Sequence, residues 1–184
     1  MRNILLVSAT KLEHHDRELF GIPIHIIGVG KVEAALNTKK LIENHKLAHG
    51  GGKPSRVINF GSCGNLKNHK RGEVLEIGTV YDDFYGCVVP EHDPIEITNS
   101  PYKLFTTDTF YDTSEVYSKS YVENIKKCDV VDMEGYSIAK VCQNERISLS
   151  LYKWVSDDGS TEDWQANAAA GYNNFKKLFK EKYL

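Results

Sequence analysis

Short apolar runs alternate along the chain with segments whose apolar residues recur at helical spacing. Residues 4–7 form one continuous apolar run and residues 22–27 form a second, which is typical of strands covered on both faces of a sheet. Between residues 31 and 46, apolar positions that include Val32 and Ile42 follow a helical period, which predicts a helix. The beginning of the chain therefore predicts buried strands joined by a helix.

The remainder of the chain continues this alternation. Further strands are predicted at residues 56–60, before a Gly-rich loop, and at residues 72–89, 104–107, 130–131 and 148–156. Helices are predicted at residues 114–126 with Ser114 as N-cap, in the segment that ends at Cys142, and at the C-terminus, where one amphipathic helix carries Trp164, Ala168, Tyr172, Phe175, Leu178 and Phe179.

Strands that alternate with helices predict an α/β sandwich with a largely parallel sheet. The 184 residues show no internal repeat and no linker, so we expect a single domain over residues 1–184. In such folds ligands bind at the carboxyl ends of the strands. The loops that follow the strands are therefore expected to meet at one site, namely the loops after Val7, Ile27, Phe60, Val131 and Val155.

Composition narrows the class of protein. Hydrophobic residues make up 41% and charged residues 26% of the chain, and the formal net charge is −2, so nothing favours a nucleic-acid partner. The first apolar run is too short for a signal peptide or a membrane span, so no membrane association is expected. The cysteines form no CxxC pair, and reduced thiols in a cytoplasm are the simplest interpretation of Cys63, Cys87, Cys128 and Cys142.

Two motifs suggest ligand chemistry only weakly. The sequence GVGK at residues 28–31 lacks the spacing of an ATP-binding P-loop, and Val32 stands where that motif has Ser or Thr. It is read as a tight turn into a helix, and the helix N-terminus can hold an anion or polar group. His45 and His49 have the spacing of a metal pair, but no third ligand is evident, so neither a metal nor a cofactor is predicted.

Three acidic residues each follow a different predicted buried strand. Singly, Glu13 reads as a solvated residue. Of the two acids that end the strand at residues 148–156, Asp158 suits a cap of the next turn, whereas Asp157 lies closer to the apolar run and can point into the cleft. Glu134 lies in Asp132-Met133-Glu134, between a strand and a helix, and a buried charge there is costly unless it is paired or used. If Glu13, Glu134 and Asp157 cluster, their carboxyl groups are suited to acid–base chemistry.

Several segments together resemble the nucleoside phosphorylase and nucleosidase superfamily, most closely the methylthioadenosine/S-adenosylhomocysteine nucleosidases. In chain order they are ILLVSATKLE, IGVGKVEAAL, VINFGSCGNL, RGEVLEIG, TTDTF, VVDMEGYSIAKVC and VSDDGS, which lie between residues 4 and 160. The most specific part is Asp-Met-Glu before a helix, followed by Ser-Asp after the next strand. The resemblance implies a three-layer α/β sandwich in which a twisted, mostly parallel mixed sheet is flanked by helices, assembled as a homodimer.

The resemblance also implies roles for individual residues. Glu134 would bind the ribose hydroxyls, with Met133 packing on the sugar. Asp157 would reach N7 of the purine, with Ser156 supporting its loop, and this role requires Asp157 to carry or share a proton near neutral pH. Glu13 would orient and deprotonate a water molecule. These roles divide the charge of N-glycosidic cleavage between the sugar and the base.

Further residues of the implied site surround the base and the sugar. Phe110 would stack on the base, and Ser62 would line the sugar and water end. Gly61 next to it permits close approach of a ligand. Asp132 is expected to face away and cap the following turn.

The resemblance implies hydrolysis of a purine nucleoside, 5′-methylthioadenosine or S-adenosylhomocysteine, with release of adenine. Two alternatives stay open. One is a phosphorylase. Bacterial purine phosphorylases bind phosphate with an Arg at the position where this chain has Asn59, but Arg56 and Lys153 remain candidate phosphate ligands. A catalytically inactive nucleoside-binding protein is the other alternative, because a hairpin usual between the first two strands looks deleted near residues 17–25.

Overall fold

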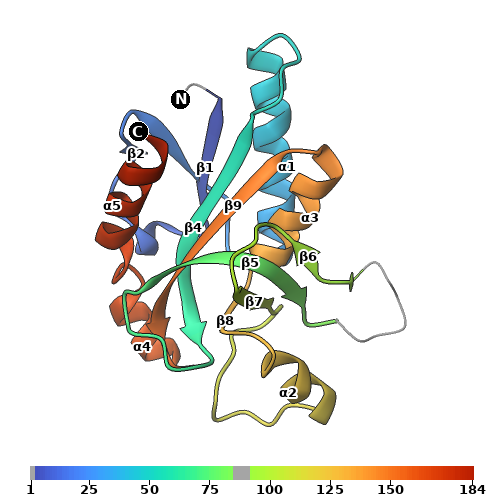
Figure 1. Ribbon diagram of the computed structural model, residues 1–184, viewed down its shortest axis with the longest axis vertical. Coiled ribbons are helices and arrows are strands. Elements are labelled where there is room, and N and C mark those ends of the chain that lie inside the picture. Colours follow the sequence, from blue (N-terminus) through green and yellow to red (C-terminus); the bar gives the residue numbers. More distant parts are fainter. Residues whose placement is uncertain (1–2, 85–91) are drawn as a thin grey trace.

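The computed structural model describes residues 3–84 and 92–184, and Figure 1 shows their arrangement. In chain order the elements are β1 (Ile4–Ser8), the 3-10 helix η1 (Lys11–Glu13), β2 (Glu18–Leu19), β3 (Ile22–Ile26), α1 (Lys31–Ala48), β4 (Arg56–Asn65), β5 (Val74–Asp82), β6 (Ile95–Glu96), β7 (Tyr102–Thr106), α2 (Lys119–Ile125), β8 (Val130–Asp132), α3 (Gly135–Glu145), β9 (Ser148–Asp157), α4 (Thr161–Asn167) and α5 (Tyr172–Tyr183). Cys87 and the end of the strand predicted for residues 72–89 lie outside the described residues.

The strands form one mixed sheet, part of which closes on itself. Along the sheet the order is β2-β3-β1-β4-β8-β7-β5-β6, and β9 pairs with both β4 and β5. The strands β4, β8, β7, β5 and β9 therefore form a closed ring. Within the described residues β4 pairs in parallel with β1 and β9 but antiparallel with β8, and β5 pairs in parallel with β7 but antiparallel with β6 and β9.

The predicted α/β class with a central sheet and flanking helices is confirmed, but a mostly parallel three-layer sandwich describes only part of the molecule. The barrel forms because β4 and β5 each change partner along their length, and β5 passes from β9 at residues 74–76 to β7 at residues 77–82. The first half of β4 pairs with β1, whereas Gly64 and Asn65 pair with β8. A bulge between Cys63 and Gly64 bends β4 at this change of partner.

Helices cover both faces of the open part of the sheet (Figure 1). Ala34 and Ile42 of α1 and Ile138 of α3 are fully buried in one hydrophobic cluster with the sheet. On the other face α5 closes a second cluster, whose largest fully buried side chains are Phe60, Tyr152, Trp154, Phe175 and Phe179. The packing fixes the ends of β1, β4 and β9 between these two layers.

The single C-terminal helix predicted from periodicity is wrong, because the segment forms two helices. Trp164 lies on α4, and α5 begins after Gly171. A Cβ atom at residue 171 would lie 2.2 Å from Cβ of Trp154, so the backbone packs directly against that side chain and the chain turns there. The predicted apolar face persists in α5 alone, as the buried residues Tyr172, Phe175 and Phe179.

Two other local predictions are corrected. The helix predicted from Ser114 begins later, as α2, with Ser118 as the N-cap whose hydroxyl accepts from the N–H of Tyr121. Ser114 instead donates both its N–H and its hydroxyl to Asp112, which forms a turn. The hairpin that looked deleted is present in a short form, since β2 pairs antiparallel with β3.

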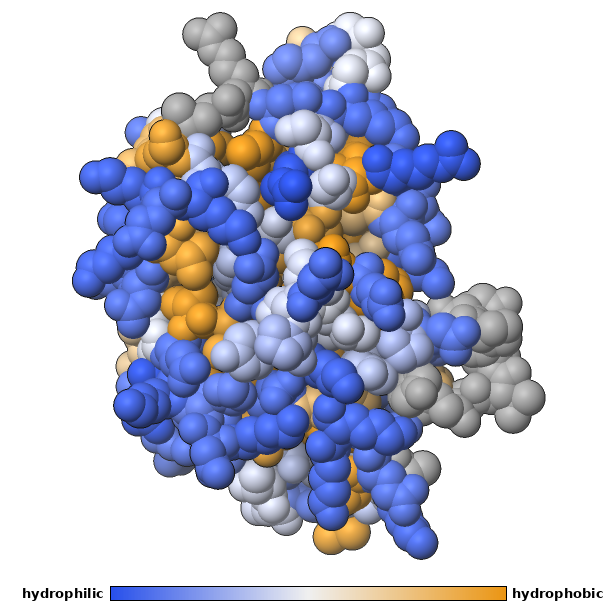
Figure 2. All heavy atoms as spheres, viewed as in Figure 1, coloured by the Kyte–Doolittle hydropathy of each residue, from blue (hydrophilic) through white to orange (hydrophobic). Residues whose placement is uncertain are grey.

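The face of the molecule seen in Figure 2 is mostly hydrophilic, with apolar surface confined to separate areas. This distribution fits a chain whose large apolar side chains lie in the interior. Among the described helices, none combines the length and apolar composition that a membrane span requires.

Candidate active site

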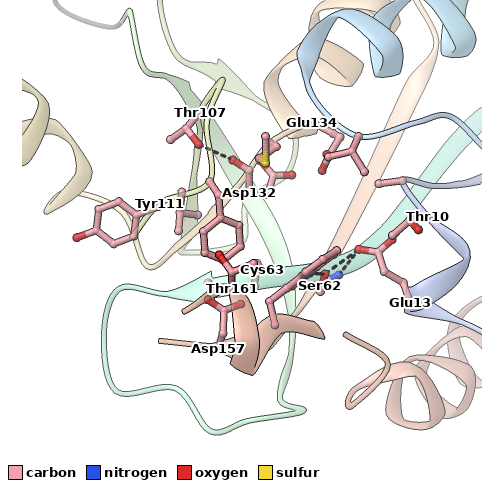
Figure 3. Close-up of a pocket in the computed structure, with 17 residues that line it drawn as sticks. Thr10, Glu13, Ser62, Cys63, Thr107, Tyr111, Asp132, Glu134, Asp157 and Thr161 are labelled. Atoms are coloured by element: carbon pink, nitrogen blue, oxygen red, sulfur yellow. Dashed lines mark hydrogen bonds between the residues drawn. The ribbon is translucent and has the colours of Figure 1, made fainter. Parts of the chain in front are cut away.

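A cavity of about 180 Å³ lies where β1, β4, β8 and β9 end, close to the loop after β7 (Figure 3). This volume is several times the roughly 30 Å³ share of a water molecule in the liquid, so the cavity has ligand rather than single-water dimensions. It is lined by Ala9, Thr10, Glu13, Val29, Ser62, Cys63, Gly64, Thr107, Phe110, Tyr111, Val131, Asp132, Met133, Glu134, Asp157, Thr161 and Trp164. The segments predicted to converge thus do meet, but the loop predicted after Phe60 is wrong, because residues 61–65 continue β4.

The three acidic residues singled out in the sequence are buried around this cavity. Glu13, Glu134 and Asp157 are 3%, 5% and 2% exposed, although they come from η1, the start of α3 and the end of β9. Such burial excludes the interpretation of Glu13 as a solvated residue. Buried carboxyl groups need hydrogen-bond partners or charge partners, and each of the three has a different set.

Glu13 is held by two serines. Its Oε1 accepts from the N–H and the hydroxyl of Ser62 at 2.7 and 2.8 Å, and its Oε2 accepts from the hydroxyl of Ser8 at 2.6 Å. A Cβ atom at Gly61 would lie 2.5 Å from Oε1, so only glycine leaves room for this carboxylate. Thr10 caps η1 and sets the turn that brings Glu13 back towards β4.

The sequence suggested that Asp132 faces away from the site, and this prediction is wrong. It lines the cavity, and its Oδ2 lies 2.8 Å from Nζ of Lys153, which is 1% exposed. It does cap the following turn, because the same oxygen accepts from the N–H of Gly135. Burial disfavours the charged ammonium, but the carboxylates of Asp132, Glu134 and Glu13 outweigh burial and raise the pKa of Lys153.

Glu134 has fewer partners than its neighbour Asp132. Its Oε1 accepts from the backbone N–H of Gly30 at 2.9 Å. Burial, followed by repulsion from Asp132, raises the pKa of Glu134 to about 8. The turn GVGK therefore does present a helix N-terminus to an anion-binding position, and in this structure the group held there is the protein's own carboxyl group.

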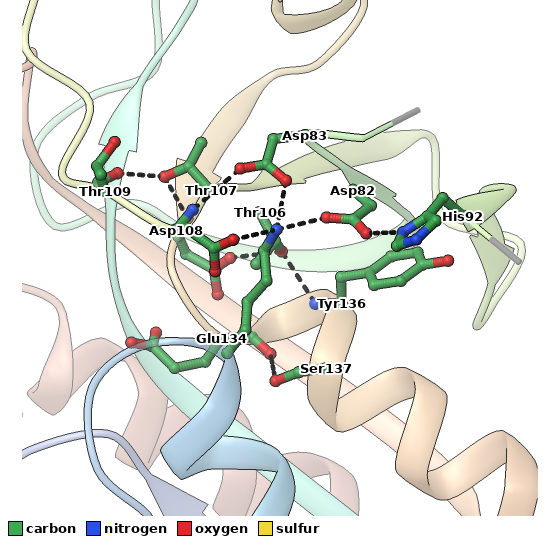
Figure 4. Close-up of polar contacts among 12 residues, drawn as sticks. Asp82, Asp83, His92, Thr106, Thr107, Asp108, Thr109, Glu134, Tyr136 and Ser137 are labelled. Carbon is green, nitrogen blue, oxygen red and sulfur yellow. Dashed lines mark hydrogen bonds and ion pairs between the residues drawn. The ribbon is translucent and has the colours of Figure 1, made fainter. Parts of the chain in front are cut away.

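The start of α1 is fixed by a group of ion pairs beside Glu134 (Figure 4). The ammonium of Lys31 contacts the carboxylates of Asp82 and Asp83, and that of Asp108 at 3.6 Å. These partners come from the end of β5 and from the loop after β7. The contacts join three segments next to the cavity and hold the N–H of Gly30 in position for Glu134.

Asp157 is placed by the irregular pairing of β9 with β4. The register shifts so that Gly64 pairs with Asp157 rather than with Ser156. The side chain of Asp157 accepts from the N–H of Gly159 at 2.9 Å and lies 2.7 Å from the hydroxyl of Ser156. That hydroxyl also lies 3.1 Å from the carbonyl oxygen of Cys63, so it can donate to either oxygen.

Three aromatic side chains, Phe110, Tyr111 and Trp164, and a methionine also line the cavity. The rings of Phe110 and Trp164 meet edge to face, with centroids 6.4 Å apart. Met133 lies between Asp132 and Glu134 and also lines the cavity. Aromatic and thioether surfaces of this kind suit a planar heterocycle.

Six of the eight predicted site residues line the cavity, namely Glu13, Ser62, Phe110, Met133, Glu134 and Asp157. Gly61 and Ser156 lie behind it, in contact with Glu13 and Asp157 respectively. The sequence prediction missed Ser8 and Trp164, because Ser8 ends an apolar strand and Trp164 fits the periodicity of a helix. Their only signal was position, since Ser8 lies within the segment ILLVSATKLE and Trp164 follows the segment VSDDGS.

No lysine or arginine is among the cavity-lining residues within the described part of the chain. Lys153 is turned towards Asp132, and Arg56 donates to the hydroxyl of Ser150. Asn59 is fully buried and donates to the carbonyl oxygen of Val7. No group of three His, Cys, Asp or Glu side chains with metal-binding geometry occurs within residues 3–84 and 92–184.

The sequence matches no protein-family model and no curated protein. Solved structures with a similar fold include 5′-methylthioadenosine/S-adenosylhomocysteine nucleosidase from Neisseria meningitidis in complex with methylthio-immucillin-A (TM-score 0.77, 17% identity, 98% of each chain covered). Futalosine hydrolase of Helicobacter pylori is also similar (TM-score 0.74, 19% identity, 96% of this chain and 95% of that chain). A third is the nucleosidase from Colwellia psychrerythraea in complex with adenine (TM-score 0.75, 16% identity, 95% and 92%).

Proposed function

We propose that this chain, which has the fold of the nucleoside phosphorylase and nucleosidase superfamily, hydrolyses the N-glycosidic bond of a purine nucleoside. The proposed substrate is 5′-methylthioadenosine or S-adenosylhomocysteine, and the released base is adenine. The observation that carries the proposal is the set of three buried carboxyl groups, Glu13, Glu134 and Asp157, around one cavity. The nucleosidase complexes with an inhibitor and with adenine support this choice of ligand.

The proposed reaction divides the developing charges among the three acids. As the bond from C1′ to N9 breaks, its electron pair moves to the base, and protonated Asp157 donates its proton to N7. Glu134, which loses its proton when the substrate binds, accepts hydrogen bonds from the ribose hydroxyls and stabilises the positive charge that develops on the sugar. Glu13 takes a proton from a water molecule whose oxygen forms the new bond to C1′.

The neighbours of Asp157 can accommodate a protonated carboxyl group. The hydroxyl of Ser156 has a second acceptor, the carbonyl oxygen of Cys63 at 3.1 Å. It can therefore donate to Cys63 while it accepts from a protonated Asp157. In the same proposal Phe110 stacks on the base and Met133 packs on the sugar.

The charges around the cavity support hydrolysis over phosphorolysis. Phosphate carries two or three negative oxygens and is bound by charge-assisted donors. The described residues that line the cavity include acids but neither lysine nor arginine. Lys153, a candidate phosphate ligand in the sequence, is held by Asp132.

The test is release of free base by the purified protein from methylthioadenosine, S-adenosylhomocysteine and inosine, with and without phosphate. The proposal expects adenine from the first two substrates in the absence of phosphate. Turnover that requires phosphate would instead identify a phosphorylase. A thermal shift with nucleoside but no base release would identify a binding protein without activity.

Substitution of the acids tests their assignment. Asp157→Asn removes the proton for N7, and Glu134→Gln removes the negative charge beneath the sugar, so each should lower kcat/KM by about 10²–10⁴-fold while the fold is kept. Initial rates of adenine release at several substrate concentrations measure kcat/KM, and circular dichroism measures whether the fold is kept. Asp158→Asn, in an exposed neighbour of Asp157, is the matched control and should retain activity. Full turnover by either site variant contradicts the assignment.

We also propose that the protein is a cytoplasmic homodimer. Cys63, Cys128 and Cys142 are buried free thiols, which suits a reducing compartment. An apolar stripe at the start of α1, formed by Val29, Val32 and Leu36, is 49%, 69% and 63% exposed. A second copy that covers this stripe would bury it beside the cavity, because Val29 also lines the cavity.

A further inference from the structure

The two oxygens of Glu13 differ in how many hydrogen bonds they accept. Among the described residues, Oε1 accepts two, both from Ser62, and Oε2 accepts one, from the hydroxyl of Ser8. Each carboxylate oxygen offers about two acceptor positions. The acceptor position that remains is therefore on Oε2.

Trp164 fixes the direction of the hydrogen bonds on the Oε1 side. Its indole Nε1 lies 3.0 Å from Oγ of Ser62. An indole N–H can only donate, and an ionised carboxylate can only accept. The hydroxyl of Ser62 therefore accepts from Trp164 on one lone pair and donates its proton to the ionised carboxylate of Glu13.

The serine on the Oε2 side has more freedom. The hydroxyl of Ser8 lies 2.6 Å from Oε2 of Glu13 and 3.4 Å from the carbonyl oxygen of Thr10. When Oε2 gains a proton, this hydroxyl can turn to Thr10 and accept from Glu13. Ser62 has no second acceptor for its hydroxyl among the described residues, and its backbone N–H also donates to Oε1, so a proton on Oε1 would displace hydrogen bonds that a proton on Oε2 leaves in place.

We infer that Trp164 is a positioning residue, which acts through Ser62 to keep Oε1 of Glu13 occupied and so leaves Oε2 as the oxygen that receives the proton of the attacking water. This inference rests on the proposed hydrolysis. In that step an O–H bond of water breaks, its proton goes to Oε2, and the water oxygen bonds to C1′. The bond from C1′ to N9 breaks, and its electron pair moves to N9. The water supplies both atoms, so no other reactant is needed.

The position of Trp164 in the fold suits this role. It lies on α4, whose first turn is capped by the hydroxyl of Ser160, which accepts from the N–H of Asp163. This helix follows Asp157 after a short turn. The segment that carries the proposed general acid, Asp157, therefore also contacts the proposed general base, Glu13, through Trp164 and Ser62. This keeps the two carboxyl groups in a fixed geometry relative to each other.

The experiment compares steady-state kinetics of wild type, Trp164→Phe, Ser62→Ala and the double variant. Phenylalanine keeps the aromatic wall but removes the N–H, so kcat should fall about tenfold, equivalent to one hydrogen bond, with KM nearly unchanged. The double variant should be no slower than Ser62→Ala, because Trp164 acts through that hydroxyl. Trp164→Met provides the same comparison if the phenylalanine variant does not fold.

Trp154→Phe is the matched control, because the chain has two tryptophans and Trp154 also donates its indole N–H, to the carbonyl oxygen of Ala168 at 2.7 Å. That change should lower Tm but leave kcat and KM unchanged. A wild-type kcat in Trp164→Phe overturns this inference alone. So does a double variant whose loss of kcat equals the product of the losses in Trp164→Phe and Ser62→Ala. Absence of base release by the wild type overturns the proposed function and this inference together.

Discussion

Asp132 and Glu134 are two residues apart in the sequence, yet the structure gives them opposite environments. Asp132 accepts from Thr106, Gly135 and Lys153, so its charge is matched inside the protein. Glu134 accepts from one backbone N–H, at Gly30. A buried carboxyl group with so little compensation favours its neutral form, which is why its pKa is raised to about 8. In the proposed reaction, Glu134 can therefore lose its proton when a ligand binds and accept hydrogen bonds from the ligand's hydroxyl groups.

This raised pKa predicts how stability depends on pH. The folded protein holds the proton of Glu134 up to about pH 8, whereas the pKa of a free Glu side chain is 4.5. The stabilisation from this proton is complete below pH 4.5 and is lost as the pH rises through 8. Glu134→Gln avoids that loss, so its Tm should exceed the wild-type Tm by an amount that grows between pH 5 and pH 9, measured by calorimetry without ligand.

Glu18→Gln provides the control for that measurement, since Glu18 is an exposed carboxylate on β2. Its Tm should differ from the wild-type Tm by the same small amount at every pH. A Glu134→Gln variant that follows the wild-type pH profile would show that the carboxyl group is not buried as described.

At the scale of elements, one carboxylate joins α1 to α3. Glu145 at the end of α3 accepts from Lys39 and Lys46 of α1 and lies 3.2 Å from the ammonium of Lys53. Hydrogen bonds from Lys39 and Lys46 lower the pKa of Glu145 to about 2. The two helices pack against each other. This contact therefore stabilises the pair of helices whose N-caps are Gly30 and Glu134.

Glu145→Gln should therefore destabilise the protein by about 1 kcal/mol at pH 7, as expected for a networked surface ion pair. Because the folded pKa is depressed, the contribution of Glu145 is present above pH 4.5 and is lost as the pH falls towards 2. Urea unfolding at pH 7 and at pH 3 should show the difference shrinking at the lower pH. Glu123→Gln, which removes an exposed pair with Lys119 at 3.9 Å, should change nothing measurable.

At the scale of the whole molecule, the apolar stripe of Val29, Val32 and Leu36 remains exposed after the chain has folded. If two copies bury it against each other, Val32→Asp combined with Leu36→Asp should convert the dimer to a monomer, since buried unpaired carboxylates oppose association. Light scattering after gel filtration measures the mass. Leu47→Asp, at the exposed far end of α1, should leave the dimer intact, and a monomeric wild type would contradict the proposed homodimer.

The sequence by itself determined the local elements and the candidate acids. The helix predicted over residues 31–46 and the alternation of strands with helices follow from periodicity, which depends only on neighbours along the chain. The motif around residues 132–134 and the acid at Asp157 were visible for the same reason. Boundaries such as Ser114 failed because a nearby turn used the capping hydroxyl.

Only the tertiary structure decided the closure of the barrel, the pairing of Asp132 with Lys153 and the contact of Trp164 with Ser62. Each joins segments that are distant in sequence, and the periodicity of one segment carries no information about which side chain a distant segment will place against it. The charge state of Glu134 was decided in the same way, because it depends on burial and on neighbours that exist only after the chain has folded.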